Sequence, residues 1–134
     1  FFPDVRIFSI DPHDGRLGAS DRRIDLFRPS FEAFNKNINR AGLTRIVDAI
    51  QDHPQNVEWN KPISLLFIDG LHDYPSVSRD FAHFFKWVKP GGYIVFHDYA
   101  DYYPGVKAFV DELLACEVVV RANLTESLIV LRKP

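Results

Sequence analysis

Apolar positions along the chain fall into short runs rich in β-branched and aromatic residues and into longer stretches with helical spacing. The short runs predict strands at 5–10, 44–50, 63–69, 93–98, 117–122 and 127–133. The longer stretches predict helices at 30–42, 74–88 and 104–115, and the aperiodic residues 13–29 predict a loop. This alternation indicates a doubly wound α/β sheet that is mostly parallel. The last strand follows a connection too short for a parallel crossover, so we expect it to run antiparallel.

Local signals refine these elements. Ser30 and Asp73 are predicted N-caps, and the sequence KPGG at 89–92 is predicted to stop the helix at 74–88. The run ISLLFID at 63–69 is almost continuously apolar, which predicts a strand buried on both faces.

Composition and charge narrow the class of protein. The length of 134 residues suits one domain over 1–134, and the net charge of −2 gives no electrostatic basis for binding nucleic acid or an anionic membrane. No apolar stretch approaches the ~20 residues of a membrane span, and the N-terminus carries no secretory signal. Cys116 is the single cysteine, which excludes an internal disulfide, and we expect it to be buried in a strand. A cytoplasmic location is the default expectation.

Acidic residues follow four of the predicted strands. They are Asp11, Asp52, Asp69 and Asp98. Ligands of open parallel sheets bind beyond the carboxyl ends of the strands, so we expect these acids to gather at one rim and form a site. Any one of them alone is explained as an ordinary turn residue or helix cap.

The strongest candidate pair is Asp69 with Asp98, because their strands are consecutive and joined by a helical crossover. Neighbouring strands lie ~4.8 Å apart, and two carboxylates so close repel unless a proton or a cation lies between them. A hard cation such as Mg²⁺ suits oxygen ligands. His72 and His97 flank the pair, and they are either functional or ordinary hydrogen-bonded histidines. Tyrosines follow these strand ends and either shape a pocket or pack the loops: Tyr74, Tyr99, Tyr102 and Tyr103.

The stretch LLFIDGLHDYPSVSRDFAHFFKWVKPGGYIVFHDY resembles the core of class I methyltransferases that use S-adenosylmethionine (SAM). It is most similar to the branch of small O-methyltransferases related to macrocin and sugar O-methyltransferases, in which one strand ends in Asp-Gly-x-His and the next in His-Asp-Tyr. The resemblance is strong over 63–99 and extends over 5–134. It implies a Rossmann-like sheet and SAM as the cofactor.

The resemblance also implies residue roles. Asp11 matches the acid that binds the ribose hydroxyls of SAM, and Asp52 lies where the family places a polar residue near the adenine amine. Asp69 and Asp98 match the metal-binding acids of the metal-dependent members, with Mg²⁺ as the candidate ion, and His97 stands where some of those members have an acid. His72 matches a proposed general base. We therefore assign Asp69 to cofactor binding, catalysis and the metal, His72 to catalysis, and His97 and Asp98 to the metal.

The chain departs from the family at its front, because no glycine-rich cofactor loop fits before Asp11. Gly15 and Gly18 come after this acid, on the wrong side of it. The family's usual first strand, which lies centrally between the strands at 5–10 and 63–69, is therefore missing. Either these two strands pair directly or a segment outside the chain fills the gap. The chain also contains no Met, and we expect it to be the C-terminal part of a longer methyltransferase domain.

The predicted function is methylation of a small-molecule hydroxyl, on a sugar, polyketide or phenol, with metal assistance left open. A cation would lower the pKa of the acceptor hydroxyl, and a histidine, which titrates near neutrality, would accept its proton. The partners predicted are the acceptor and, because of the gap in the sheet, a second copy of the chain. A non-catalytic binding or assembly module and a metal-dependent hydrolase remain as alternatives. A nicotinamide dehydrogenase is disfavoured because no G-x-G-x-x-G follows a strand.

Overall fold

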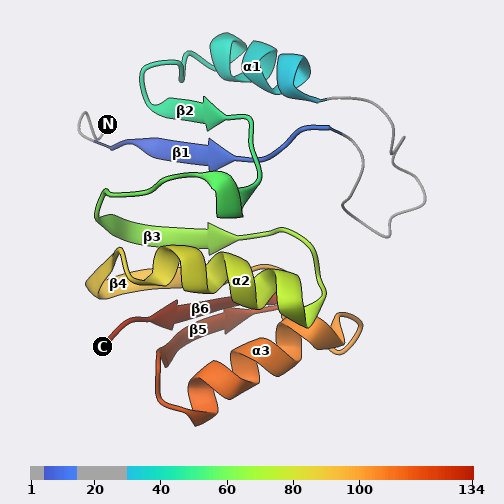
Figure 1. Ribbon diagram of the computed structural model, residues 1–134, viewed down its shortest axis with the longest axis vertical. Coiled ribbons are helices and arrows are strands. Elements are labelled where there is room, and N and C mark those ends of the chain that lie inside the picture. The colour runs from blue at the N-terminus through green and yellow to red at the C-terminus, as the bar shows by residue number, and fades with distance from the viewer. Residues whose placement is uncertain (1–4, 15–29) are drawn as a thin grey trace. The chain divides into compact units, whose positions relative to one another are not determined.

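The computed structural model describes residues 5–14 and 30–134 (Figure 1). Most of the predicted loop, including Gly15 and Gly18, lies outside the described residues. The chain divides into two compact units, Phe1–Val57 and Glu58–Pro134, and each is described by itself. That the whole chain acts as a single domain stays a prediction.

In its described residues, 5–14 and 30–57, the first unit contains two parallel strands and one α-helix. Its elements are β1 (Ile7–Ile10), α1 (Phe31–Arg40), β2 (Val47–Ile50) and a short 3-10 turn, η1 (Pro54–Asn56). β1 and β2 pair in register, with Ile10 opposite Ile50, so both strands end at the same rim of this unit. Ser30 stands at the N-cap of α1 but does not cap it. Its hydroxyl instead contacts Nδ1 of His13 at 2.8 Å.

The second unit is a four-stranded sheet with two helices. Its elements are β3 (Ile63–Ile68), α2 (Tyr74–Phe85), β4 (Val88–Phe96), α3 (Pro104–Ala115), β5 (Val120–Thr125) and β6 (Leu128–Arg132). The strand order is β3-β4-β6-β5, with β3 and β4 parallel and β6 antiparallel to both of its neighbours. The predicted α/β class and the antiparallel last strand are therefore confirmed. β5 lies later than the predicted 117–122, because Glu117 and Val118 belong to the turn that leaves α3.

The KPGG segment does not lie where the sequence predicts. α2 ends at Phe85, and residues 89–92 lie inside β4. Ile63 pairs with Val88 and Leu65 with Tyr93, so β4 carries extra residues opposite this part of β3. Glycine allows this irregularity because Gly91 adopts a positive φ of 76° and a Cβ on Gly92 would meet backbone oxygens. The KPGG segment is therefore part of β4 and does not form a turn between α2 and β4.

The core of the second unit lies between the sheet and the two helices. Fully buried side chains of the sheet are Val88, Ile94, Phe96, Ile129 and Leu131. The helices bury Val77, Phe81 and Phe84 from α2 and Val106, Phe109 and Val110 from α3. Phe81, Phe96 and Phe109 form a cluster with ring centroids 5.4 to 6.1 Å apart. This packing fixes the strand ends that carry the candidate site.

The prediction that residues 63–69 are buried on both faces is wrong. Leu65 and Phe67 are 58% and 51% exposed, whereas Ile63 and Ile68 are buried. The reason is that α2 packs on one face of β3 only, so side chains on the other face of this strand are exposed. Within the first unit β1 pairs with β2, and within the second β3 pairs with β4. Direct pairing between the strands at 5–10 and 63–69 stays a prediction.

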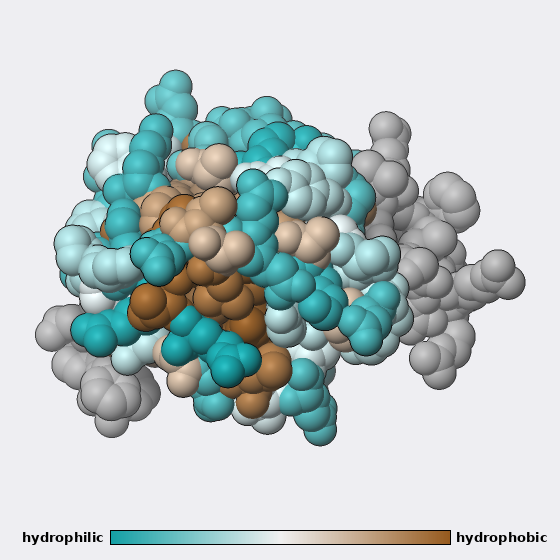
Figure 2. Space-filling model, turned by 90° about the horizontal axis from the view of Figure 1, so that it is seen from below, coloured by the Kyte–Doolittle hydropathy of each residue, from teal (hydrophilic) through white to brown (hydrophobic). Residues whose placement is uncertain are grey.

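The other edge of this sheet is β5, all of whose residues are exposed. Figure 2, seen from the side on which α3 lies in Figure 1, shows apolar side chains gathered in a patch bordered by polar ones. Exposed apolar residues at this end of the sheet include Val118, Val120 and Leu124. Cys116 is also exposed, at the C-cap of α3, so its predicted burial in a strand is wrong. Within the described residues, no helix is both long enough and apolar enough to span a membrane.

Candidate functional site

The two acids that end consecutive strands lie at one rim of the second unit. β3 and β4 are parallel neighbours with Ile68 opposite Phe96, so Asp69 and Asp98 leave the sheet on the same side. The backbone N–H of His97 donates to the carbonyl of Ile68 at 3.1 Å and extends the pairing by one step. Asp98 then turns away from the strand with a φ of 59°, a left-handed conformation that aspartate tolerates better than most residues. The predicted adjacency of this pair is confirmed.

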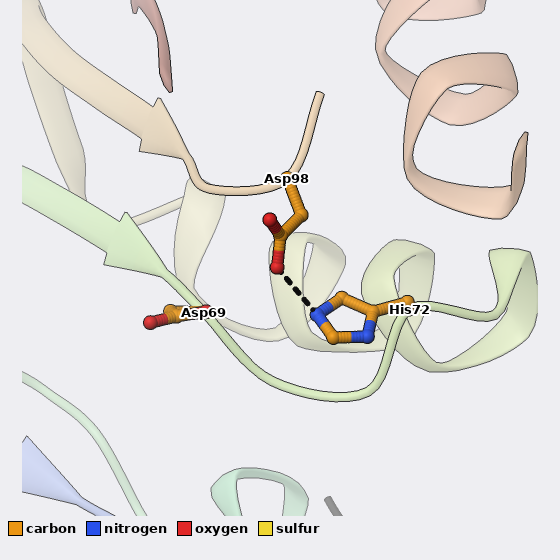
Figure 3. A group of neighbouring side chains, drawn as sticks. All are labelled: Asp69, His72 and Asp98. Atoms are coloured by element: carbon orange, nitrogen blue, oxygen red, sulfur yellow. Dashed lines mark ion pairs between the residues drawn. The ribbon is translucent and has the colours of Figure 1, made fainter. Parts of the chain in front are cut away.

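His72 joins the rim from the loop between β3 and α2. Its Nε2 lies 2.8 Å from Oδ2 of Asp98, and the two side chains point toward each other in Figure 3. Only 18% of the His72 side chain and 14% of the Asp98 side chain are exposed. The loop is held because Asp73 caps α2, accepting a hydrogen bond from the N–H of Ser76 at 2.9 Å. That bond is the main reason why the pKa of Asp73 lies below its ordinary value.

His97 completes the group at the more open side of the rim. Its Nδ1 lies 3.0 Å from Oδ2 of Asp98 and 3.4 Å from Oδ1 of Asp69. This nitrogen is shielded from solvent but is not aligned for a hydrogen bond with either carboxylate. Two carboxylates and two imidazoles therefore meet within a few ångströms, as the sequence predicts.

The donor atoms suit a divalent cation. Ligand atoms from Asp69, His72 and Asp98 all lie within 4.8 Å of one another. Carboxylate oxygens with one imidazole nitrogen form a donor set that Mg²⁺, Mn²⁺ or Zn²⁺ can use. The geometry thus gathers His72 with the two acids, whereas the sequence assigns the metal to Asp69, His97 and Asp98. The role of His97 as a ligand stays a prediction.

The contact between His72 and Asp98 also bears on which nitrogen can act as a base. An ionised carboxylate only accepts hydrogen bonds, so a hydrogen bond between the two side chains would place the hydrogen on Nε2 of the imidazole. The lone pair of a neutral His72 would then be on Nδ1. A carboxylate that fixes the tautomer of a histidine in this way is a recurring arrangement in enzymes that move protons.

The other two predicted acids lie in the first unit, after neighbouring strands. Asp11 follows β1, and its Oδ1 accepts from the backbone N–H of His13 at 2.6 Å. Asp52 follows β2 and accepts from the side chain of Asn56 at 2.9 Å and from the backbone N–H of His53 at 2.7 Å. These two bonds, led by that of Asn56, hold the pKa of Asp52 below its ordinary value. The predicted roles of Asp11 and Asp52 in cofactor binding stay predictions.

Two residues that support the site, Gly105 and Asp80, were not identified from the sequence. Gly105, at the start of α3, faces the loop of His72 so closely that a Cβ there would lie 2.6 Å from the backbone nitrogen of Tyr74 and even nearer the carbonyl oxygen of His72. Asp80, on α2, has a carboxylate oxygen 3.5 Å from the position of a Cβ on Gly70. Burial raises the pKa of the Asp80 carboxyl, and the guanidinium of Arg79 offsets part of that rise. The sequence offered one signal for Asp80: it is a charged residue directly before Phe81, which belongs to the predicted apolar face of the helix.

Comparison with solved structures supports this fold. The O-methyltransferase NovP superposes with a TM-score of 0.77 at 17% identity, over 97% of this chain and 60% of that one. The TDP-rhamnose 3'-O-methyltransferase CalS11 gives 0.68 at 15% identity, over 98% and 60% of the two chains. TomG from Streptomyces achromogenes, an O-methyltransferase solved with SAM, gives 0.65 at 16% identity, over 99% and 64%. The chain thus spans about three fifths of these proteins.

Sequence comparison supports the same relationship. An uncharacterised protein of Acanthamoeba polyphaga mimivirus is 49% identical over 55 residues, which cover 40% of this chain and 25% of the viral protein. A family model described as a methyltransferase domain matches residues 3–99, a range that includes Asp69, His72 and Asp98. The chain therefore belongs to this methyltransferase family and has its Rossmann-like fold.

Proposed function

We propose that the protein of which this chain forms part is a SAM-dependent O-methyltransferase acting on a small-molecule hydroxyl. The observation that carries the proposal is the contact of 2.8 Å between His72 and Asp98, at the carboxyl ends of β3 and β4, in a chain of the methyltransferase family. Ligands of open α/β sheets bind at this rim. The fold relatives NovP, CalS11 and TomG are all named as O-methyltransferases, which supports oxygen as the acceptor atom.

His72 is the general base in this proposal. An acceptor hydroxyl must lose its proton for oxygen to attack a methyl group, and SAM supplies that methyl as an electrophile on sulfur. In this mechanism Nε2 of His72, which lies 2.8 Å from Oδ2 of Asp98, donates to that carboxylate, and Nδ1 accepts the proton from the hydroxyl. The carboxylate then stabilises the imidazolium that results. General-base catalysis of this kind contributes about 10²–10⁴-fold to a rate.

Asp69 and Asp98 are the proposed carboxylate ligands of a divalent cation. Their oxygens and an imidazole nitrogen fit such an ion, which would polarise the acceptor oxygen. Nε2 of His72 cannot donate to Asp98 and bind the metal at the same time. If His72 is the base, the third ligand is His97, whose Nδ1 faces both acids. If Nε2 of His72 binds the metal, another group takes the proton.

Manganese titration separates these arrangements. Mn²⁺ broadens NMR signals of nearby nuclei, and its affinity is measured on wild-type protein and on the His72→Gln and His97→Gln variants. A loss of affinity of about tenfold or more in His97→Gln alone supports His72 as the base. The same loss in His72→Gln alone assigns the ligand role to His72. A wild-type protein that binds no Mn²⁺ contradicts the metal site while leaving the base unaffected.

Cofactor binding tests the methyltransferase proposal itself. The full-length protein is titrated with SAM and with S-adenosylhomocysteine by calorimetry, and then assayed for S-adenosylhomocysteine release with panels of sugar, polyketide and phenolic acceptors. Binding of both ligands and turnover with one acceptor class is the expected result. Absence of binding by the full-length protein would contradict the proposal and favour a non-catalytic module. Tight metal binding with hydrolysis of a substrate in place of SAM binding would favour the hydrolase.

A further inference from the structure

An aromatic ring covers one face of the proposed base. The rings of His72 and Tyr103 are stacked, with centroids 3.8 Å apart and planes inclined by 26°. Tyr103 is the residue that precedes α3, so it lies at the far end of the loop that Asp98 begins. Only 18% of the His72 side chain is exposed. Tyr103 and Asp98 are two of the groups that contact it.

The two contacts constrain different motions of the imidazole. The contact of Nε2 with Asp98 fixes one atom, yet the ring plane can still tilt about the line that joins the two groups. A second ring in nearly parallel contact removes this freedom, since tilting would break the stack. The direction of the Nδ1 lone pair follows the ring plane, so the stack sets where the base points. Misplacement of a reacting group by a fraction of an ångström is enough to slow a reaction.

The position of Tyr103 is itself fixed by the backbone. Its N–H donates to the carbonyl of Ala100 at 3.0 Å, and its carbonyl accepts from the N–H of Lys107 at 3.2 Å. Gly105, two residues later, lies against the carbonyl of His72 with no space for a side chain. The start of α3 and the loop of His72 therefore pack backbone to backbone, which brings the two rings together.

The neighbouring tyrosines make other contacts. Tyr74 donates through its hydroxyl to Glu112, and Tyr99 donates to Asp111 at 2.6 Å, so both are tied to α3. Tyr103 has no hydroxyl hydrogen bond to another residue in the described ranges, and its contact with His72 is made by the ring. This contrast predicts that the ring of Tyr103 matters and its hydroxyl does not.

We propose that Tyr103 is a positioning residue for His72: its ring holds the imidazole in the plane in which Asp98 can fix Nε2. The inference rests on the proposed function, because it assumes that His72 acts on the acceptor. It goes beyond that function by assigning the orientation of the base to the aromatic ring of the residue that precedes α3. Tyr103 touches the base and is not assigned any contact with substrate.

The test compares Tyr103→Phe, which keeps the ring, with Tyr103→Leu, which removes it, in the full-length protein. Tyr93→Leu is the control, because Tyr93 is a 44% exposed tyrosine on β4 outside the site. The ring protons of His72 are followed by NMR with labelled histidine and assigned by their loss in His72→Gln. Stacking places them over the tyrosine ring and shifts their signals upfield. The kcat and the KM for SAM and acceptor are measured on the same samples, and thermal unfolding confirms that each variant is folded.

We expect Tyr103→Phe and Tyr93→Leu to keep the upfield signals and a kcat within about twofold of wild type. Tyr103→Leu should move the signals downfield and lower kcat by roughly tenfold with KM nearly unchanged. Wild-type kcat in Tyr103→Leu, or an equal loss in Tyr103→Phe, would overturn the positioning role while the proposed function stands. If Tyr103→Leu does not fold, the Phe variant still decides between ring and hydroxyl. A wild-type protein without turnover contradicts the proposed function and this role together.

Discussion

Oδ2 of Asp98 lies within contact of two imidazole nitrogens, Nε2 of His72 at 2.8 Å and Nδ1 of His97 at 3.0 Å. The partnership with His72 joins the end of β4 to the loop before α2, and it is the most enclosed ionisable pair of the candidate site. In the proposed mechanism this carboxylate sets which nitrogen of His72 carries the hydrogen. The predictions below follow from this contact and from the packing that holds it.

Replacing Asp98 with asparagine should reduce turnover much more than stability. Asparagine keeps the shape of the side chain and tolerates the left-handed backbone at this position. Its amide can present an N–H to Nε2 and so stabilise the wrong tautomer of His72, which should lower kcat by about 10²-fold or more. Steady-state kinetics and thermal unfolding measure the two effects.

The matched control is Asp101→Asn, an exposed aspartate three positions further along the same loop. It should leave kcat within about twofold of wild type, since surface substitutions away from special contacts have small effects. Equal kcat values for Asp98→Asn and the control would remove Asp98 from the proposed mechanism.

A methyl group on Gly105 should disturb both the fold and the site. The Cβ of Gly105→Ala would meet backbone atoms of His72 and Tyr74, which cannot rotate away as a side chain can. We expect a loss of about 1–3 kcal/mol in the free energy of unfolding, as for overpacked cores, together with reduced turnover. Denaturant unfolding measures the first quantity.

Gly70→Ala provides the comparison for that loss. A Cβ on Gly70 lies 3.5 Å from an oxygen of Asp80, an ordinary contact distance, so its effect on unfolding should stay below about 1 kcal/mol. Equal stability of the two alanine variants would contradict the close approach of Gly105 to the backbone of the His72 loop.

The fold was largely predictable because the apolar patterns are strong and local. The helix at 104–115 matches α3 at both ends, since Pro104 starts it and Glu117 takes a left-handed φ of 54° just beyond its end. The boundary between α2 and β4 was not predictable. KPGG is typical of a turn, and only pairing with β3 reveals that this segment continues a strand. The exposure of Leu65 and Phe67 likewise depends on which elements cover the faces of β3, and the sequence of the strand alone does not contain this.

The part of the site that depends on the order of the strands was predictable. Parallel neighbours place Asp69 and Asp98 at one rim, and the loop length brings His72 there. Two contacts were not predictable, because both depend on how the start of α3 packs against the loop between β3 and α2. They are the stacking of Tyr103 on His72 and the close packing of Gly105 against the backbone of that loop. Tyr103 was one of four tyrosines near the strand ends, with nothing in the sequence to separate it from the others.

The buried carboxyl of Asp80 should make stability fall as pH rises. Burial raises its pKa above 3.8 in the folded state, so the folded protein binds this proton more tightly than the unfolded chain. Its contribution is therefore most favourable below the unfolded pKa and declines as pH rises through the folded pKa. Asp80→Asn stays neutral, so it should gain stability over wild type at neutral pH and lose that advantage as pH approaches 3.8.

Asp111→Asn is the contrasting variant, because the pKa of Asp111 is lowered whereas that of Asp80 is raised. The stability contribution of Asp111 therefore depends on pH in the opposite direction. The hydrogen bond from Lys107, followed by that from Tyr99, holds the pKa of Asp111 below its ordinary value. Its stabilisation is present above the unfolded pKa and disappears as pH falls through the folded pKa. The variant should lose up to about 1 kcal/mol at neutral pH, since the pair is exposed, and nothing in acid. Thermal unfolding across pH that shows the same trend for both variants would contradict the assigned environments.

The most direct measurement is the rate of S-adenosylhomocysteine formation by full-length His72→Gln beside His83→Gln. His83 lies in the last turn of α2, at the opposite end of the helix from the His72 loop. The account predicts a loss of about 10²–10⁴-fold in kcat for His72→Gln, with SAM affinity by calorimetry nearly unchanged and His83→Gln close to wild type. A His72→Gln enzyme that turns over at the wild-type rate would contradict the assignment of this rim as the catalytic centre.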